Sequence, residues 1–524
     1  MKKLRINKGK RVLVIALAIV LTFSFAACSS KAAGTDTGSK TDAPAADTPA
    51  AAEPVTGGEL RYGITVEPET FDPILAQSAD TRSLLFNLFE GLVKVDTAGD
   101  LQPAIAESWE VDAAGKTYAF KLRSGVKFHN GADVTAADVE YSLNTAKEAQ
   151  YAGFDNVDKI TAEGDTITLA LKEGDVEFLP FLTTAVIPKD YADQATSPVG
   201  TGPFKFESYS PQKDLVLVKN ADYWQQDLPH LDKVTVVFQA DYAALQLALE
   251  SGNIDATDIG NDVAQQLNQA DYNEFVEKYS NSVQVLALNN KVKPLGDLKV
   301  RQALNYAVNN QEIVDKAFFG KGKLVGTPVI PGLTRYYDAA LESAYQPDVE
   351  KAKTLLKEAG YEDGFDLEIT LANNYTDHIN TAEVLINQLA AVGVKATVKE
   401  VDWDTWLSDV YFGRNYESTI ISVDGPTVSP RSFLSRYVST AEDNFVNFVN
   451  TEYDKVYAQA TAEPDVDKRT DLYNQAQQIL SEDAASVYIQ DIIAFSVLRK
   501  GFAGAVSYPL FVVDFATIYK TGEQ

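Results

Sequence analysis

The chain has 524 residues and a formal net charge of −28, with 74 acidic and 46 basic side chains. A strongly acidic protein repels phosphate backbones, which argues against nucleic-acid binding. The length predicts more than one domain, and a hydrophobic fraction of 45% is ordinary for a globular protein.

The first 27 residues have the pattern of an export signal. Six basic side chains and no acidic one precede Val12, and an apolar run follows as far as Ala27, broken only by Thr22 and Ser24. A basic head, an apolar run and small residues before a break are typical of a secretory signal peptide. A permanent anchor helix is the alternative, but a stable membrane span needs about 20 apolar residues.

The only cysteine, Cys28, follows Ala26 and Ala27. This arrangement matches a lipoprotein processing site, where the cysteine sulfur receives diacylglycerol after cleavage. It predicts lipid anchoring at the extracytoplasmic face of the cell membrane. Residues 28–57 contain no aromatic side chain and are rich in Ala, Thr, Asp, Gly and Pro, which predicts a flexible tether of about 30 Å.

From Gly58 onward the patterns predict an α/β body with no internal repeat. Thr135 followed by Asp138 predicts a helix N-cap, and Val300, Leu304 and Val308 recur at helical spacing. The predicted strands are 58–64, 117–123, 126–129, 166–171, 205–208, 215–219, 233–239 and 394–401. The predicted helices are 81–89, 135–146, 242–250, 298–308, 349–359, 381–391 and 468–481, with a further helix beginning at residue 402 and β structure in the last forty residues.

The motifs that would indicate catalysis are missing or incomplete. Residues 113–117 (AAGKT) are similar to the end of a phosphate-binding loop, but the required first glycine is replaced by Glu110, so a hairpin is predicted. His129, His230 and His378 stand alone, without the spacing of a zinc site. We therefore expect no metal, no cofactor and no enzymatic activity.

Residues 101–143 (LQPAIAESWEVDAAGKTYAFKLRSGVKFHNGADVTAADVEYSL) closely resemble the defining segment of the family-5 extracellular solute-binding proteins, the peptide- and nickel-type receptors of ABC importers. Matching segments run in order along almost the whole chain after the tether. They are TFDP (70–73), NLFEGLV (87–93), PVGTGPFKF (198–206), ADYWQQDLPHLDKV (221–234), ALESGNID (248–255), LKVRQALNYAV (298–308) and DVEKAKTLLKEAGY (348–361).

The resemblance implies an α/β, two-lobed periplasmic-binding-protein fold of type II, in its large three-subdomain variety, with a hinge between the lobes. Residues 58–284 and 490–524 would form lobe one, and residues 285–489 lobe two. The chain would cross between the lobes near 285–289 and 487–490. When such lobes close on a solute, the membrane transporter can recognise the closed conformation and distinguish it from the open one.

The function implied is that of a monomeric, lipid-anchored receptor that captures a small solute, most simply a peptide or peptide-like compound, and delivers it to ABC permease subunits. One alternative is a receptor for a non-peptide solute such as a nickel or metal chelate or an oligosaccharide. Another is an exported hydrolase on a similar fold.

Ligand contacts in this family are expected from three loops, here 66–70, 373–377 and 422–436. Dipeptide-binding members resemble one another in carrying an arginine in the second loop and an aspartate in the third. This chain has no arginine at 373–377, and Asp424 lies two residues before the expected aspartate position. Trp403 and Trp406, three residues apart on one helix face, would stack on a ligand or pack on the sheet. The predicted ligand-binding residues are Tyr62, Glu67, Tyr375, Trp403, Trp406, Asp424 and Arg431.

Overall fold

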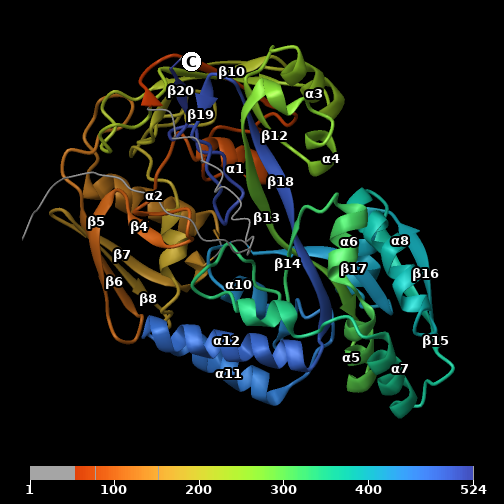
Figure 1. Ribbon diagram of the computed structural model, residues 1–524. Helices are drawn as coiled ribbons and strands as arrows, with labels where there is room; N and C mark the ends of the chain where they lie inside the picture. The colour runs from red at the N-terminus through yellow and green to blue at the C-terminus, as the bar shows by residue number, and fades with distance from the viewer. Residues whose placement is uncertain (1–53, 77, 152, 426, 523–524) are drawn as a thin grey trace, which may run out of the picture. The chain divides into compact units, whose positions relative to one another are not determined.

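The computed structural model describes residues 54–522 except 77, 152 and 426 (Figure 1). The predicted signal peptide, Cys28 and the tether up to residue 53 lie outside the described residues. The term "first lobe" denotes residues 58–284 with 490–522, and "second lobe" denotes residues 285–489; these boundaries stay a prediction.

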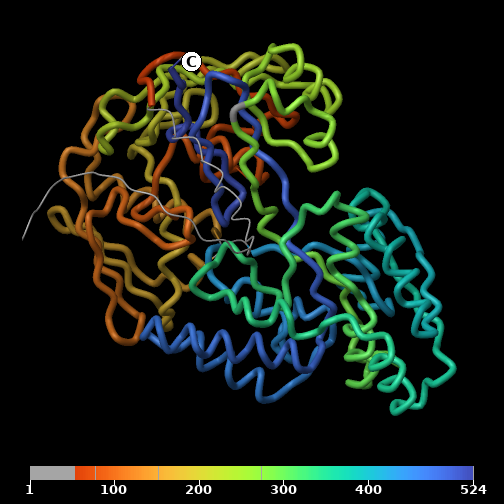
Figure 2. Tube along the Cα trace, viewed as in Figure 1, coloured from red at the N-terminus to blue at the C-terminus, as the bar shows by residue number. Residues whose placement is uncertain are grey.

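One large mixed sheet runs through the molecule, and its two longest strands lie in the middle. The strand order is β16-β15-β17-β13-β18-β12-β2-β11-β10-β9, with β14 (Gly322–Leu324) paired to β18. β13 (Tyr272–Leu288) and β18 (Ser486–Arg499) are antiparallel and run side by side through the trace (Figure 2). These two strands join the part of the sheet that belongs to the first lobe to the part that belongs to the second.

The first-lobe part of the sheet has a clear two-residue periodicity. In β11, Val234, Val236 and Phe238 are buried and alternate with half-buried residues, as a strand with one core face requires. β2 lies parallel to β11 and β12, and β9, β10 and β11 form antiparallel pairs. The bounds are β2 (Glu59–Ile64), β9 (Phe204–Ser210), β10 (Asp214–Lys219), β11 (Lys233–Phe238) and β12 (Ala256–Ile259).

In the second-lobe part of the sheet, β15 and β17 are largely buried on both faces. Neighbouring residues of one strand enter different cores: Ile420 and Leu286 pack in one cluster, Ile421 and Val285 in another. Strands buried on both faces lack a strict alternation of polar and apolar residues, and TIISV in β17 lacks it. The bounds are β15 (Phe365–Ala372), β16 (Val394–Val401), β17 (Ser418–Asp424), α5 (Leu298–Ala307), α6 (Asn310–Ala317), α7 (Val349–Glu358), α8 (Thr376–Ala390), α11 (Thr451–Ala462) and α12 (Val466–Glu482).

A separate four-stranded antiparallel sheet, in the order β5-β6-β8-β7, packs against α2. Residues 113–117 lie in its β5–β6 hairpin, where Asp112 N donates to Thr117 O at 3.1 Å, so the hairpin prediction is confirmed. The predicted N-cap of α2 is confirmed as a capping box between Thr135 and Asp138. The bounds are β5 (Ala106–Val111), β6 (Thr117–Leu122), β7 (Val157–Glu163), β8 (Thr166–Leu171) and α2 (Ala136–Glu148).

The remaining described elements are short. They are β1 (Pro54–Val55), β3 (Val93–Val95), β4 (Leu101–Pro103), β19 (Phe502–Ala503), β20 (Tyr519–Thr521), α1 (Ala79–Leu85), α3 (Tyr242–Glu250), α4 (Asn261–Ala264), α9 (Trp403–Thr405), α10 (Arg431–Leu434), the π-helix η5 (Trp406–Phe412) and the 3₁₀ helices η1 (Phe154–Asn156), η2 (Leu179–Thr183), η3 (Gln269–Asp271), η4 (Ala339–Ser343) and η6 (Ser435–Tyr437). No helix within the described residues is both long and apolar enough to span a membrane.

Several local predictions are corrected. Residues 126–129 form no strand, only a single bridge between Lys127 and Asp133, because the segment is a tight turn closed by Gly131. The helix predicted over 81–89 spans Ala79–Leu85, because Ser78 caps it from outside. The last residues of the predicted tether are ordered, since β1 pairs with β20.

Candidate ligand-binding site

Three segments that carry predicted site residues meet at one edge of the second-lobe sheet. β15 is parallel to both β16 and β17, so their carboxyl ends, Ala372, Val401 and Asp424, point the same way. In open α/β sheets, ligands bind outside the carboxyl ends of parallel strands. Tyr375 and Trp403 follow two of these ends within three residues, and Asp424 forms the third.

An unbroken row of aromatic rings lines this edge. Tyr375 meets Trp403 edge-on at 5.5 Å, Trp403 is stacked on Trp406 at 5.1 Å with 6° between the planes, and Trp406 lies 6.1 Å from Tyr411. Trp406 is 2% exposed, and its Nε1 donates to Thr419 Oγ1 at 3.0 Å. Tyr375 is 38% exposed and Trp403 is half-buried. Tyr375 and Trp403 can therefore contact a ligand, whereas Trp406 supports them from the core.

The row depends on an unusual backbone. α9 continues directly into the π-helix η5, which starts at Trp406. One turn of π-helix adds a residue to the repeat and is frequent at functional sites. Sequence spacing alone predicts neither the π-helix nor the place of Tyr411.

An arginine that the sequence reasoning missed lies beside Asp424. Arg436 Nη2 donates to the backbone oxygen of Asp424 at 3.1 Å, and its buried Nε has no hydrogen-bond partner among the described residues. Within the described part of the chain, Arg436 makes no ion pair. Both side chains also act on Tyr411: burial raises the pKa of that phenol, Arg436 opposes the rise and Asp424 adds to it. An exposed carboxylate and an unpaired guanidinium thus lie at one end of the aromatic row.

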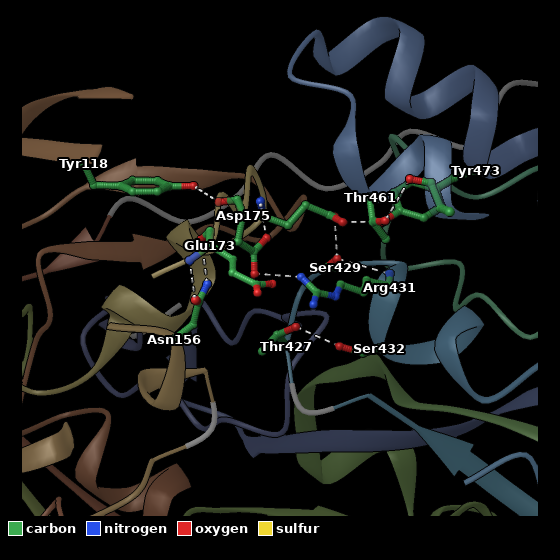
Figure 3. A network of polar contacts seen from close by, with 12 residues as sticks. Tyr118, Asn156, Glu173, Asp175, Thr427, Ser429, Arg431, Ser432, Thr461 and Tyr473 are labelled. Carbon is green, nitrogen blue, oxygen red and sulfur yellow. Dashed lines mark hydrogen bonds and ion pairs between the residues drawn. The ribbon is translucent and has the colours of Figure 1, made fainter. Parts of the chain in front are cut away.

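The other arginine of this segment, Arg431, faces the first lobe. Its Nη1 lies 2.8 Å from Asp175 Oδ2. Burial alone would lower the pKa of Arg431, but the Asp175 carboxylate raises it above its ordinary value. Beside this pair, Ser429 Oγ donates to Glu177 Oε1 at 2.7 Å and the Tyr473 hydroxyl donates to Glu177 Oε2 (Figure 3).

The two first-lobe candidates make their contacts within the first lobe. Tyr62 is 2% exposed, and its ring packs edge-on against Phe515 at 5.1 Å. Glu67 accepts hydrogen bonds from Gln212 N at 2.9 Å and the Tyr209 hydroxyl at 2.7 Å, which lower its pKa. Their roles in ligand binding stay predictions.

The half-buried His129 and the buried His378 both have structural partners. His129 Nε2 lies 3.1 Å from Gly202 O, and burial lowers its pKa to about 4. His378 Nε2 lies 3.3 Å from Ser422 Oγ, and burial lowers its pKa to about 4 as well. The described residues contain no group of three or more side chains that could hold a metal ion.

Arg301, in the family motif LKVRQALNYAV, has a structural role. Its guanidinium donates to the backbone oxygens of Leu295, Gly296 and Asp483. It therefore closes the end of a loop and takes no part in the candidate site.

Comparisons with known proteins agree with this architecture. The family model "Bacterial extracellular solute-binding proteins, family 5 Middle" matches residues 100–445. The chain is 28% identical over 500 residues to the dipeptide-binding protein of Escherichia coli, covering 86% of this chain and 92% of that protein. It is 31% identical over 443 residues to a glutathione-binding protein of Salmonella typhimurium, covering 79% and 85%.

A solved structure of an ABC transporter substrate-binding protein from Listeria monocytogenes superposes with a TM-score of 0.78 at 25% identity, covering 89% of this chain and all of that one. The predicted two-lobed α/β fold of type II is confirmed by this likeness and by the family match.

Proposed function

The chain belongs to the bacterial extracellular solute-binding proteins of family 5, and from this premise we propose that it captures short zwitterionic peptides or similar compounds for an ABC importer. As a member of this family it works with an ABC transporter and binds peptides or similar solutes. The finer statements about the ligand, the hinge and the membrane anchor are our proposals.

The ligand would bind at the carboxyl edge of β15, β16 and β17. The observation that carries this proposal is the half-buried, unpaired Arg436 beside the exposed Asp424. Asp424 would bind an ammonium group and Arg436 a carboxylate, each through charge-assisted hydrogen bonds. Because the two residues touch, the ligand's opposite charges must lie only a few bonds apart, as they do in a short peptide.

The aromatic row would accept the apolar part of the same ligand. Trp403 has one face stacked on Trp406 and is only half-buried, and Tyr375 stands at its edge. Such rings bind flat or apolar side chains of many shapes, and each close aromatic contact contributes about 0.5–1.5 kcal/mol beyond area burial. The site would fix the charged groups of a peptide and tolerate variation in its side chain.

Lobe closure would bend β13 and β18. The β13–β18 ladder shifts register between Tyr279 and Val283 and again between Gln284 and Val285, and Asn281 has a positive φ of 57°. Bulges interrupt the ladder locally and let a strand bend. Cys28, outside the described residues, would carry the lipid that holds the protein at the extracytoplasmic face of the membrane.

A calorimetric titration tests the ligand class directly. We expect heat of binding with a mixed pool of dipeptides that have free carboxylates, and at least tenfold weaker binding of the same pool with C-terminal amides. Equal binding of both pools would contradict the role of Arg436. No heat with either pool would overturn the peptide assignment, and native mass spectrometry of gently purified protein would then identify the solute class.

A further inference from the structure

Two carboxylates of the first lobe, Asp175 and Glu177, are directed at the segment that follows Asp424. Their loop joins β8 to η2 and is held firmly. Asp175 N donates to Gly115 O at 2.9 Å, and Glu177 N donates to Asp175 Oδ1 at 2.9 Å. The Tyr118 hydroxyl donates to Asp175 O. These bonds hold the loop that carries both carboxylates, and Figure 3 shows the Asp175 carboxylate directed at Arg431.

The loop is also fixed at its start, by Asn156. The Asn156 amide donates to Glu173 O at 3.0 Å and accepts from Glu173 N at 3.0 Å. These two bonds involve only the backbone of Glu173, and its side chain is exposed. Glu173 thus lies in the same loop as Glu177 and carries the same side-chain group. Unlike Glu177, its side chain is not bonded to Ser429 or Tyr473 of the second lobe.

The partners of the two carboxylates come from the second lobe. Arg431 binds Asp175 at 2.8 Å, Ser429 donates to Glu177 at 2.7 Å, and Tyr473 of α12 donates to the other oxygen of Glu177. Glu177 is 7% exposed, and burial raises its pKa while the two hydroxyls oppose the rise. A buried carboxylate without hydrogen-bond donors is costly in free energy. The Glu177 contact therefore favours the one relative position of the two lobes in which Ser429 and Tyr473 can donate to it.

Ser429 and Arg431 belong to the same short connection as the proposed ligand residues. They lie five and seven residues after Asp424, and Thr427 Oγ1 is hydrogen-bonded to Ser432 Oγ at 2.8 Å. On the far side of the connection, Arg436 reaches back to Asp424 O. The residues that contact the first lobe and the residues of the proposed ligand site therefore belong to one continuous stretch of chain, residues 424–436.

We propose that Asp175 and Glu177 are positioning residues that fix the segment 427–436, so that Asp424 and Arg436 take their binding arrangement only while the lobes are in contact there. The coupling runs through a named, contiguous set of bonds, as a physical account of coupling requires. The effect on affinity rests on the proposed function, whereas the ordering of the segment does not.

Hydrogen exchange measured by mass spectrometry on the ligand-free protein tests the ordering. In Glu177→Ala we expect amides of residues 427–436 to exchange about tenfold faster than in the wild type, because the removed bonds link a charged group to two hydroxyls. The peptide covering β17 should keep its protection. Asp175→Asn is the milder variant in case Glu177→Ala fails to fold. The matched control is Glu173→Gln, which removes a charge from the same loop and should exchange like the wild type.

Unchanged exchange of the segment in Glu177→Ala and Asp175→Asn would overturn the proposal, and so would an equal acceleration in Glu173→Gln. In parallel, calorimetry with the free-carboxylate dipeptide pool should show at least fivefold weaker binding for Glu177→Ala and none of this loss for Glu173→Gln. If the pool gives no heat with the wild type, the proposed ligand class fails, and the exchange data alone still decide whether the carboxylates order the segment.

Discussion

Replacement of Asp491 by asparagine should remove a pH dependence of the stability that arises in β18. Asp491 is fully buried. Ser280 Oγ donates to its Oδ1 at 2.8 Å, whereas its Oδ2 has no hydrogen-bond partner in the part of the chain that the structure describes. Burial raises the pKa of this carboxyl from its ordinary 3.8 to about 7, and the hydrogen bonds from Ser280 and the neighbouring backbone only partly oppose the rise.

The sign of the effect follows from proton binding. Between pH 4 and pH 7 the folded protein keeps the proton on Asp491 while the unfolded chain releases it, so this residue lowers the stability as the pH rises through that range. A displacement from 3.8 to about 7 corresponds to about 4 kcal/mol. The nearest cation by register, Lys323 on β14, is paired with Glu342 at 2.7 Å and does not neutralise Asp491.

Urea unfolding of the wild type and Asp491→Asn at several pH values measures this difference. The variant should gain about 4 kcal/mol relative to the wild type between pH 4 and pH 8, because asparagine can accept the same hydrogen bonds and does not ionise. All other titrating groups are common to both proteins and cancel in the difference. A difference that stays constant within about 1 kcal/mol over this range would refute the reasoning.

Three further predictions concern the proposed site and the anchor. Trp406→Ala should destabilise the fold by about 3–5 kcal/mol in urea unfolding, because its ring is 2% exposed. Trp403→Ala should lower the free energy of unfolding by at most about 2 kcal/mol yet weaken dipeptide binding. Equal losses of stability in the two variants would contradict the assignment of Trp406 to the core and of Trp403 to ligand contact. Arg436→Gln should weaken binding of free-carboxylate dipeptides by about tenfold or more and leave the binding of amidated dipeptides unaffected. Arg431→Gln loses a cross-lobe ion pair, and any effect on binding should be the same for both peptide pools. Cys28→Ser should appear in the soluble fraction after cell fractionation, and its persistence in membranes would refute the lipid anchor.

Much of the secondary structure follows from local signals. The period-two pattern of β11, the N-caps Thr135 and Asp402 and the apolar spacing of α5 are sufficient to place those elements within a few residues. These signals are local because a strand face, a cap and a helix face each involve residues close in sequence. The turn at 126–129 resembles a strand in sequence because Val126 and Phe128 alternate with half-buried residues, yet they are buried there without a ladder.

The proposed site is only partly readable from the sequence. Tyr375, Trp403 and Asp424 can be named because they follow strand ends, and the carboxyl ends of parallel strands converge. Trp406 cannot be told apart from Trp403, because its burial depends on Thr419 and on the π-helix that turns its ring inward. Arg431 and Arg436 stand in one segment and look equivalent in sequence.

The sequence by itself determined the family, the order of strands and helices, the expected export signal and the loops from which ligand contacts would come, because each of these depends on residues near one another along the chain. Only the tertiary structure decided that Arg431 forms an ion pair, whereas Arg436 forms none within the described residues. That difference depends on Asp175, which lies 256 residues before Arg431 and meets it only when the two lobes come together.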